Sequence, residues 1–264
     1  MAKLDDDSKS VTARALAVLD AFDSGHRHQT LAAISRRAGL PLTTTHRFVN
    51  QLVEAEALIR CSDGAYEIGS KLWRLGILAS VHADLRELAL PYMEDIYSLG
   101  VDAVQIGVLD GVRCLVIDRI SGSRSMSVKS RPGARLPLHA SGIGKVLLAF
   151  SGDELQDAAL RTLERITEQT ITSPAELRKQ LAQIKRDGFA ATKEELAIGA
   201  ISIGVPIHGY GGKVIAAMGV VIPANTKDSS HLVPILKVSA QALGRKLTAA
   251  GLSDPAGLAP TRRK

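Results

Sequence analysis

The fold of the N-terminal part is decided by residues 30–50, which read TLAAISRRAGLPLTTTHRFVN. Thr30 is a good helix-capping residue, and the eight residues after it predict a short helix. Gly39 and Pro41 end that helix, because glycine accepts a left-handed backbone and proline cannot continue a helix interior. Apolar spacing then predicts another helix over about 43–56. Two helices joined by so tight a turn indicate a helix-turn-helix motif.

The flanking segments extend this motif to a small domain. Apolar residues recur at helical spacing over residues 10–22. On the other side, residues 57–61 and 65–68 read as strands, and the Asp63-Gly64 pair between them favours a tight hairpin. Three helices and a hairpin predict a winged helix-turn-helix.

The rest of the chain mixes helices with strands. A helical pattern covers about 70–99, in two pieces broken near Pro91, and its first piece carries the only tryptophan, Trp73. The strands that follow occur as hairpins, which favours an antiparallel sheet flanked by helices and an α+β fold. The predicted strands are 101–109, 112–120, 125–131 at an edge, 200–208 and 213–222, and the predicted helices are 141–150, 174–186 and 230–250.

Composition restricts the class of protein. Hydrophobic residues make up 45% of the 264 residues and charged residues 23%, which is typical of a globular chain. No stretch approaches the ~20 apolar residues that cross a bilayer, and the acidic N-terminus lacks the apolar core of a secretion signal, so we expect a cytoplasmic protein without membrane contact. The predicted parts are a flexible N-terminus at 1–9, the winged helix-turn-helix at 10–70, a linker helix at 71–84, an α+β domain at 85–250 and a disordered tail at 251–264.

The second helix of the motif carries the residues that we expect to contact double-stranded DNA. In this motif the second helix enters the major groove, where threonine can bind phosphates or bases and arginine can bind guanine. The net charge is +6, and between His26 and Arg60 five arginines face two glutamates, so positive charge gathers at this motif. The predicted contacts are Thr43, Thr44, Thr45, His46 and Arg47 on the helix and Arg36, Arg37 and Arg60 beside it. The alternative is a winged helix used for protein assembly.

Enzyme motifs are incomplete in this chain. The sequence GIGKV at 142–146 resembles part of a phosphate-binding loop, but His139 stands where that loop needs its first glycine. His139 and Ser141 are too close in sequence to face each other on a helix, and adjacent carboxylates such as Glu194-Glu195 usually mark a solvated surface. The seven histidines show no helical pairing that suits a metal. We expect no enzymatic activity, no catalytic residue, no cofactor and no metal.

Several motifs, in order along the chain, are similar to those of one family: LPLTTTHR at 40–47, YEIG at 66–69, GARLPLHASGIGKVLLA at 133–149, KRDGFA at 185–190 and GAISIGVPI at 199–207. Over about residues 10–248 the chain thereby resembles the isocitrate lyase regulator (IclR) family of bacterial transcription factors. The resemblance implies a GAF-like C-terminal domain that binds a small organic effector beside its sheet. It also implies homodimers formed through the N-terminal region, which often pair into homotetramers.

The resemblance further implies the effector pocket. The positions carried over are Val128, Leu136, Gly142, Ile143, Thr192, Ala200, Ser202, Gly219 and Val221, with the Ser202 hydroxyl and the backbone from Ser141 to Ile143 as hydrogen-bond donors. Members that bind very small acids have an acidic residue, a cysteine and two serines where this chain has Thr192, Ser202, Gly219 and Val221. We therefore expect a less polar, roomier pocket for an aromatic or aliphatic acid.

Together these features predict a DNA-binding transcriptional regulator, with repression favoured, whose operator affinity is controlled by a small organic acid. The alternative is a metabolite-binding or enzymatic domain that carries a winged helix for protein assembly.

Overall fold

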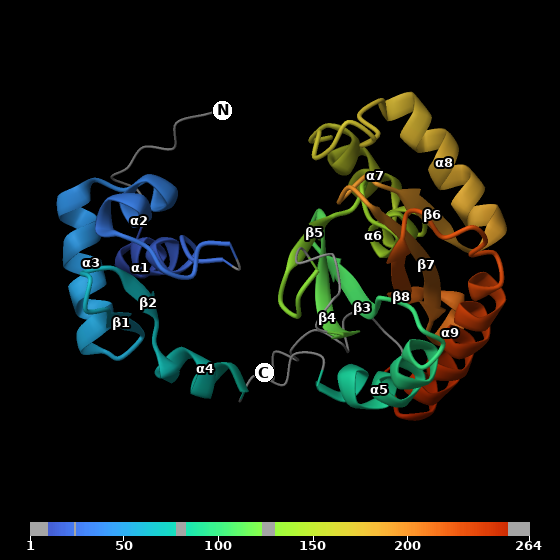
Figure 1. Cartoon of the computed structure of the whole chain (residues 1–264), viewed down its shortest axis with the longest axis horizontal. Coiled ribbons are helices and arrows are strands. Elements are labelled where there is room, and N and C mark those ends of the chain that lie inside the picture. The colour runs from blue at the N-terminus through green and yellow to red at the C-terminus, as the bar shows by residue number, and fades with distance from the viewer. Residues whose placement is uncertain (1–9, 24, 78–82, 123–129, 253–264) are drawn as a thin grey trace. The chain divides into compact units, whose positions relative to one another are not determined.

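The computed structural model describes residues 10–23, 25–77, 83–122 and 130–252. The chain divides between residues 80 and 81 into two compact units, each with its own hydrophobic core (Figure 1). The elements of the first unit are α1 (Val11–Leu19), α2 (Leu31–Ala38), α3 (Leu42–Glu54), β1 (Leu58–Arg60), β2 (Tyr66–Ile68) and α4 (Ser70–Ile77). This order of helices and antiparallel hairpin confirms the predicted winged helix-turn-helix.

Local hydrogen bonds explain where the helices of the first unit begin and end. The Ser10 hydroxyl accepts the amide of Ala13 at 3.2 Å, so it caps α1. Thr30 caps α2 in the same way. Gly39 then ends α2 with a left-handed backbone, φ 65°. The tight turn that follows directs α3 across α2, and Phe48 of α3 is buried between them in the core.

The second unit is built on one antiparallel sheet of six strands, in the order β5-β4-β3-β8-β7-β6. This confirms the predicted α+β class and the antiparallel pairing. Its strands are β3 (Ala103–Asp110), β4 (Arg113–Ser121), β5 (Arg135–Pro137), β6 (Ala190–Lys193), β7 (Ala200–His208) and β8 (Val214–Pro223), and its helices are α5 (Ala83–Tyr97), α6 (Gly142–Ala149), α7 (Asp153–Leu160), α8 (Pro174–Asp187), α9 (Leu232–Ala249) and the short turn η1 (Tyr210–Gly212).

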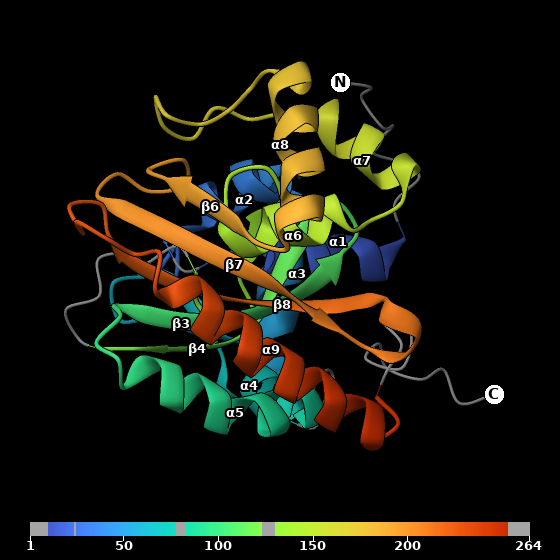
Figure 2. The ribbon, with the colours of Figure 1, turned by 90° about the vertical axis from the view of Figure 1, so that its right-hand side faces the viewer.

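Helices cover both faces of this sheet. Figure 2 shows α5 and α9 on one side, with α6, α7 and α8 on the other. Because side chains alternate along a strand, Ile106 of β3 and Met218 of β8 face α5 and α9, whereas Gln105 and Gly219 face α6. The sheet is therefore a central layer that is buried from both sides.

The N-terminus of α6 lies directly on the sheet, and glycines make this approach possible. A Cβ atom on Gly204 of β7 would lie 2.5 Å from the carbonyl carbon of Gly142 and 2.7 Å from the amide nitrogen of Ile143. A Cβ atom on Gly219 of β8 would lie 2.8 Å from Cγ2 of Ile143. Only residues without a side chain fit here, so backbone packs on backbone.

Several details differ from the sequence predictions. The predicted break near Pro91 is wrong, because α5 continues through Pro91 and buries Met93 and Ile96 beyond it. Tertiary packing outweighs the hydrogen bond that proline removes. The short strands β5 and β6 and the helix α7 were absent from the predicted set of elements. The predicted edge strand at 125–131 and the predicted pocket residue Val128 lie largely or wholly outside the described residues.

Within the described ranges, none of the helices combines the length and apolar character required to cross a membrane.

The substitution Gly204→Ala is expected to destabilise the second unit by about 1–3 kcal/mol, because its methyl group would overlap the backbone of α6. Urea unfolding followed by circular dichroism would measure this loss. Gly152→Ala is the matched control, since a Cβ atom on Gly152 would meet nothing within 4 Å. Equal stability of the two variants would contradict the close packing of α6.

Candidate nucleic-acid interface and ligand pocket

One polar stripe runs along the exposed side of α3. Thr43, His46, Arg47 and Asn50 are exposed, and their spacing of three and four residues places them on one helical face. Thr44 is half-buried beside them. The Nδ2 atom of Asn50 lies 3.4 Å from Nε2 of His46. The stripe presents hydroxyl, imidazole, guanidinium and amide groups, which are the groups that read DNA bases and phosphates.

Thr45 does not belong to this stripe. Its side chain is fully buried on the core side of α3, and its hydroxyl donates to the carbonyl of Pro41 at 3.0 Å. The prediction that Thr45 contacts DNA is therefore wrong. Three consecutive threonines cannot share one face of a helix, because successive residues are turned by about 100°.

The arginines around α3 fall into two groups. Arg36, Arg47 and Arg60 are exposed, and the Arg47 guanidinium lies 5.1 Å from the centre of the Phe48 ring. Arg37 is held within the unit, because its Nε atom donates to the carbonyl of Ala21 at 2.6 Å and its guanidinium pairs with Asp23. Arg37 braces the connection between α1 and α2, so it is less available to a phosphate than the other three.

The second unit contains a pocket at one end of the sheet, on the side of α6. The open space within it, including its mouth, is about 320 Å³. Most of this space is open to solvent, and the centre of a water molecule can occupy only about 20 Å³ of it. Since one water needs roughly 10–15 Å³ on that measure, the pocket is narrow in this conformation, in contrast to the roomier pocket expected from the sequence. Residues from strands β3, β6, β7 and β8, from the segment between β6 and β7 and from the segment before β5 surround it: Gln105, Ser130, Thr192, Glu195, Leu196, Ala197, Ala200, Ser202 and Val221.

Strand register brings four of the predicted pocket residues together. Thr192 of β6 pairs with Ser202 of β7, and Ser202 pairs with Val221 of β8. Ala200 lies two residues before Ser202, on the same face of β7. Thr192, Ser202 and Val221 thus form one row across three strands, and all four residues line the pocket.

The other predicted pocket residues within the described part of the chain do not line this space. Ser141 caps α6 by accepting the amide of Gly144 at 3.2 Å, and Gly142 and Ile143 pack on β7 and β8. Leu136 is buried in the core beneath α6. Gly219 lies below the side chain of Ile143.

Five lining residues were not predicted from the sequence, and two of them carry strongly polar groups. Gln105 comes from the middle of a strand that reads as uniformly buried, and Glu195 follows β6. Among the described residues, the Oε1 atom of Gln105 and the Oγ atom of Ser202 are buried without a hydrogen-bond partner. A buried polar atom without a partner is costly, so both atoms suit a ligand that supplies hydrogen bonds.

A buried ion pair supports one wall of the pocket. The Nζ atom of Lys145 on α6 donates to the two carboxylate oxygens of Glu195 at 2.7 and 2.8 Å, and to Oε1 of Gln180 on α8 at 2.7 Å. Burial lowers the pKa of Lys145 and raises the pKa of Glu195, and each charge opposes the shift of the other. The expectation that Glu194-Glu195 is a solvated surface pair is wrong for Glu195.

His139 and Ser141, the candidate base and nucleophile, have structural roles. His139 is buried, which lowers its pKa, and its Nε2 atom lies 2.9 Å from the carbonyl oxygen of Glu164. The Ser141 hydroxyl donates to the carbonyl of Pro137 at 3.3 Å while it caps α6. Both side chains hold the loop before α6 in place.

The substitution Lys145→Met is expected to destabilise the second unit by about 3–5 kcal/mol, because it leaves Glu195 buried without its counter-charge. The double variant Lys145→Met/Glu195→Gln is expected to recover part of that loss. Urea unfolding of both variants measures the difference. Arg178→Met is the control. It removes one positive charge from the exposed ion pair with Asp157, so we expect little change in the free energy of unfolding. A similar loss in the control would argue against a special role for the buried pair.

Comparison with known proteins identifies both units. The family model described as "IclR helix-turn-helix domain" matches residues 11–58, and "Bacterial transcriptional regulator IclR C-terminal" matches residues 78–245. The HTH-type transcriptional regulator XynR of Escherichia coli (strain K12) is 30% identical over 223 residues, which cover 83% of this chain and 88% of that protein. The Pca regulon regulatory protein of Pseudomonas putida is 31% identical over 251 residues, which cover 92% of this chain and 86% of that protein.

A solved structure agrees with these relatives. The crystal structure of an IclR homolog from Microbacterium hydrocarbonoxydans, complexed with 4-hydroxybenzoate, has a TM-score of 0.80 and 36% sequence identity. The match covers 91% of this chain and all of that chain. The resemblance seen in the sequence motifs is thereby confirmed: the chain belongs to the IclR family of bacterial transcriptional regulators.

Proposed function

We propose that this regulator binds an operator in duplex DNA through α3, with Thr43, Thr44, His46 and Arg47 directed into the major groove. The observation that carries the proposal is the continuous exposed stripe on α3, whose residues cap no helix and fill no core. The major groove is about 12 Å wide and admits one helix. Arg36 and Arg60, exposed on either side of α3, serve the phosphate backbone, whereas Thr45 and Arg37 serve the fold.

Exposed apolar side chains on the same unit support assembly as a homodimer. Val11 and Leu16 on α1 and Trp73 and Leu75 on α4 are each more than half exposed. Several large apolar side chains exposed on one unit are typical of a protein–protein contact surface, here with a second copy of the chain. A dimer would present two α3 helices to a palindromic operator with half-sites about 34 Å apart, or a multiple of that distance. Binding of this kind would take place in the bacterial cytoplasm.

The pocket beside the sheet is proposed to bind a small organic acid with one aromatic ring. The related Microbacterium protein was crystallised with 4-hydroxybenzoate, and the narrow pocket of this chain would have to widen by side-chain movement to admit one ring. The ligand carboxylate is placed beside Ser202, whose buried Oγ atom has no hydrogen-bond partner among the described residues and can donate to it. A ligand hydroxyl would then be free to donate to Oε1 of Gln105.

The ligand would control transcription by its preference for one conformation of the protein. It can shift DNA affinity only by as much as its own affinities for the two conformations differ. We propose repression of the controlled genes in the absence of ligand, as the name of the related repressor AllR of Escherichia coli suggests. We propose no enzymatic role, because His139 and Ser141 are engaged in the fold.

The substitution Arg47→Ala is expected to weaken operator binding by about 5- to 150-fold, which corresponds to 1–3 kcal/mol for a lost base contact. Gel shifts or fluorescence anisotropy with the DNA upstream of the protein's own gene would measure it. Arg178→Ala removes the same charge from an exposed position on the other unit and is expected to bind DNA normally. Unchanged binding by Arg47→Ala would exclude α3 as the recognition helix and favour a protein-assembly role.

The substitution Ser202→Ala is expected to reduce affinity for 4-hydroxybenzoate by about tenfold, the loss typical of one hydrogen bond of 1–1.5 kcal/mol. Calorimetric titration of the full-length protein measures this affinity, with acetate as a two-carbon competitor. Ser98→Ala, an exposed serine on a turn away from the pocket, is the control. Tighter binding of acetate than of the aromatic acid would contradict the proposed ligand class.

A further inference from the structure

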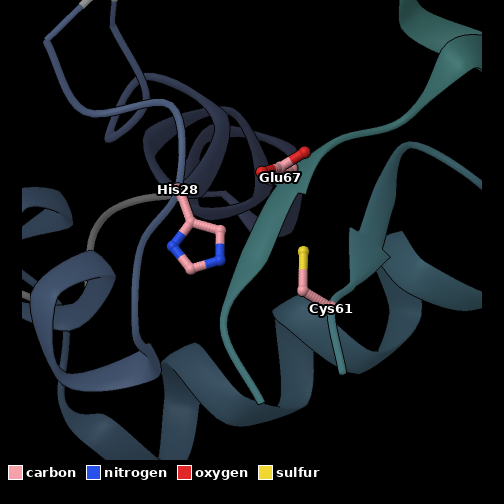
Figure 3. A group of neighbouring side chains, drawn as sticks. All are labelled: His28, Cys61 and Glu67. Atoms are coloured by element: carbon pink, nitrogen blue, oxygen red, sulfur yellow. The ribbon is translucent and has the colours of Figure 1, made fainter. Parts of the chain in front are cut away.

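Three side chains of types that ligate metals gather on the first unit, whereas the pocket described above belongs to the second. One ligand atom each of His28, Cys61 and Glu67 lies within 4.8 Å of the others. Figure 3 shows the three side chains, with Glu67 on β2, Cys61 just after β1 and His28 on the segment that runs beside them. Imidazole, thiol and carboxylate are the usual ligand types of zinc.

Backbone hydrogen bonds fix the spacing of the three segments. Gln29 and Tyr66 form an antiparallel bridge, with amide-to-carbonyl distances of 3.0 and 2.8 Å. His28 and Glu67 flank that bridge on opposite strands, so they are cross-strand neighbours. The Cys61 amide donates to the carbonyl of Ala65 at 2.8 Å, which holds Cys61 diagonally opposite Glu67. The cluster is thus held by the fold rather than by chance contact of side chains.

Neither Glu67 nor Cys61 has another role among the described residues. Glu67 makes no ion pair in that part of the chain, and Cys61 is a free thiol without a disulfide partner. Asp63 adds a second carboxylate, whose Oδ2 atom lies 3.2 Å from Nε2 of His28. Figure 3 shows that Nε2 is the ring nitrogen of His28 on the side of Cys61, so a metal ion bound there would replace the contact with Asp63.

The distances are compatible with a metal ion of zinc size. Zinc bonds of about 2.0–2.3 Å in a tetrahedron place the ligand atoms roughly 3.5 Å apart. The observed separations of up to 4.8 Å need only small side-chain rotations, which exposed His28 and Glu67 can make. The thiol excludes a preference for magnesium or calcium, since those ions take oxygen ligands.

We propose that His28, Cys61 and Glu67 bind one divalent cation of the zinc type, with water as the fourth ligand. Binding would cross-link the hairpin to the segment that precedes α2. Arg60, which we assign to the DNA backbone, immediately precedes Cys61, so an occupied site would also restrict the wing beside the DNA. Metal occupancy would then influence operator affinity without any contact with the effector pocket.

Cobalt(II) titration of the full-length protein, after treatment with a chelator and under reducing conditions, tests the proposal. Cobalt accepts the same ligands and reports a thiolate bond through its ligand-to-metal charge-transfer band. We expect one equivalent of cobalt to produce this band and zinc to displace it, because zinc binds such sites more tightly. Cys61→Ser should abolish the band, and His28→Ala and Glu67→Gln should each weaken binding by at least about tenfold.

Two matched controls separate this site from other thiols and carboxylates. Cys114→Ser should leave the band intact, because burial raises the pKa of the Cys114 thiol to about 12 and keeps it protonated. Glu54→Gln, at the exposed end of α3, should leave cobalt affinity unchanged. Circular dichroism would confirm that each variant is folded. Absence of the band in the unmodified protein, or unchanged affinity in any of the three ligand variants, would overturn the proposal.

Discussion

The contact on which the second unit depends is the backbone approach of α6 to the sheet at Gly204 and Gly219. Because no side chain separates them, the start of α6 is fixed at one height above β7 and β8. This places Lys145, one turn later, where it reaches Glu195 and Gln180. The first residue of α6, Gly142, packs on Ser202, which lines the pocket. The pocket therefore lies beside the start of α6, and the ion pair that the same helix supplies supports its wall.

Local sequence signals were sufficient to predict much of the fold. The helix-turn-helix follows from Thr30, Gly39 and Pro41, since caps and turn residues act within a few positions of themselves. The hairpin around Asp110 follows from its turn pair in the same way. Pro91 was misread because its local penalty is offset by burial of Met93 and Ile96, a tertiary effect that a short window does not contain.

The sites depend on contacts between distant residues, and here local signals were weaker. Family resemblance predicted Ser202 and Thr192 as effector-binding residues, and both line the pocket of the second unit, whereas the sequence offered no reason to select Gln105 and Glu195, which line it too. Polar residues in apolar strands or in charged runs look ordinary until the register shows what they face. The cluster of His28, Cys61 and Glu67 could not be predicted from the sequence either, because its members come from three separate segments and show no regular spacing. Thr45 was predicted to contact DNA together with Thr43 and Thr44, because residue type alone does not show which face of a helix a side chain occupies.

The pairing of Lys145 with Glu195 has a consequence for how ligand preference can change during evolution. Glu195 faces the pocket, so altering it is a direct route to a different ligand charge. Replacing Glu195 alone, however, leaves Lys145 buried without a counter-charge, and replacing Lys145 alone leaves Glu195 in the same state. A change of this pair therefore requires both substitutions, or an intermediate sequence that folds poorly. Thr192 and Val221 carry no charge, so each can be substituted alone. Diversification of ligand specificity should accordingly begin at those freely exchangeable positions.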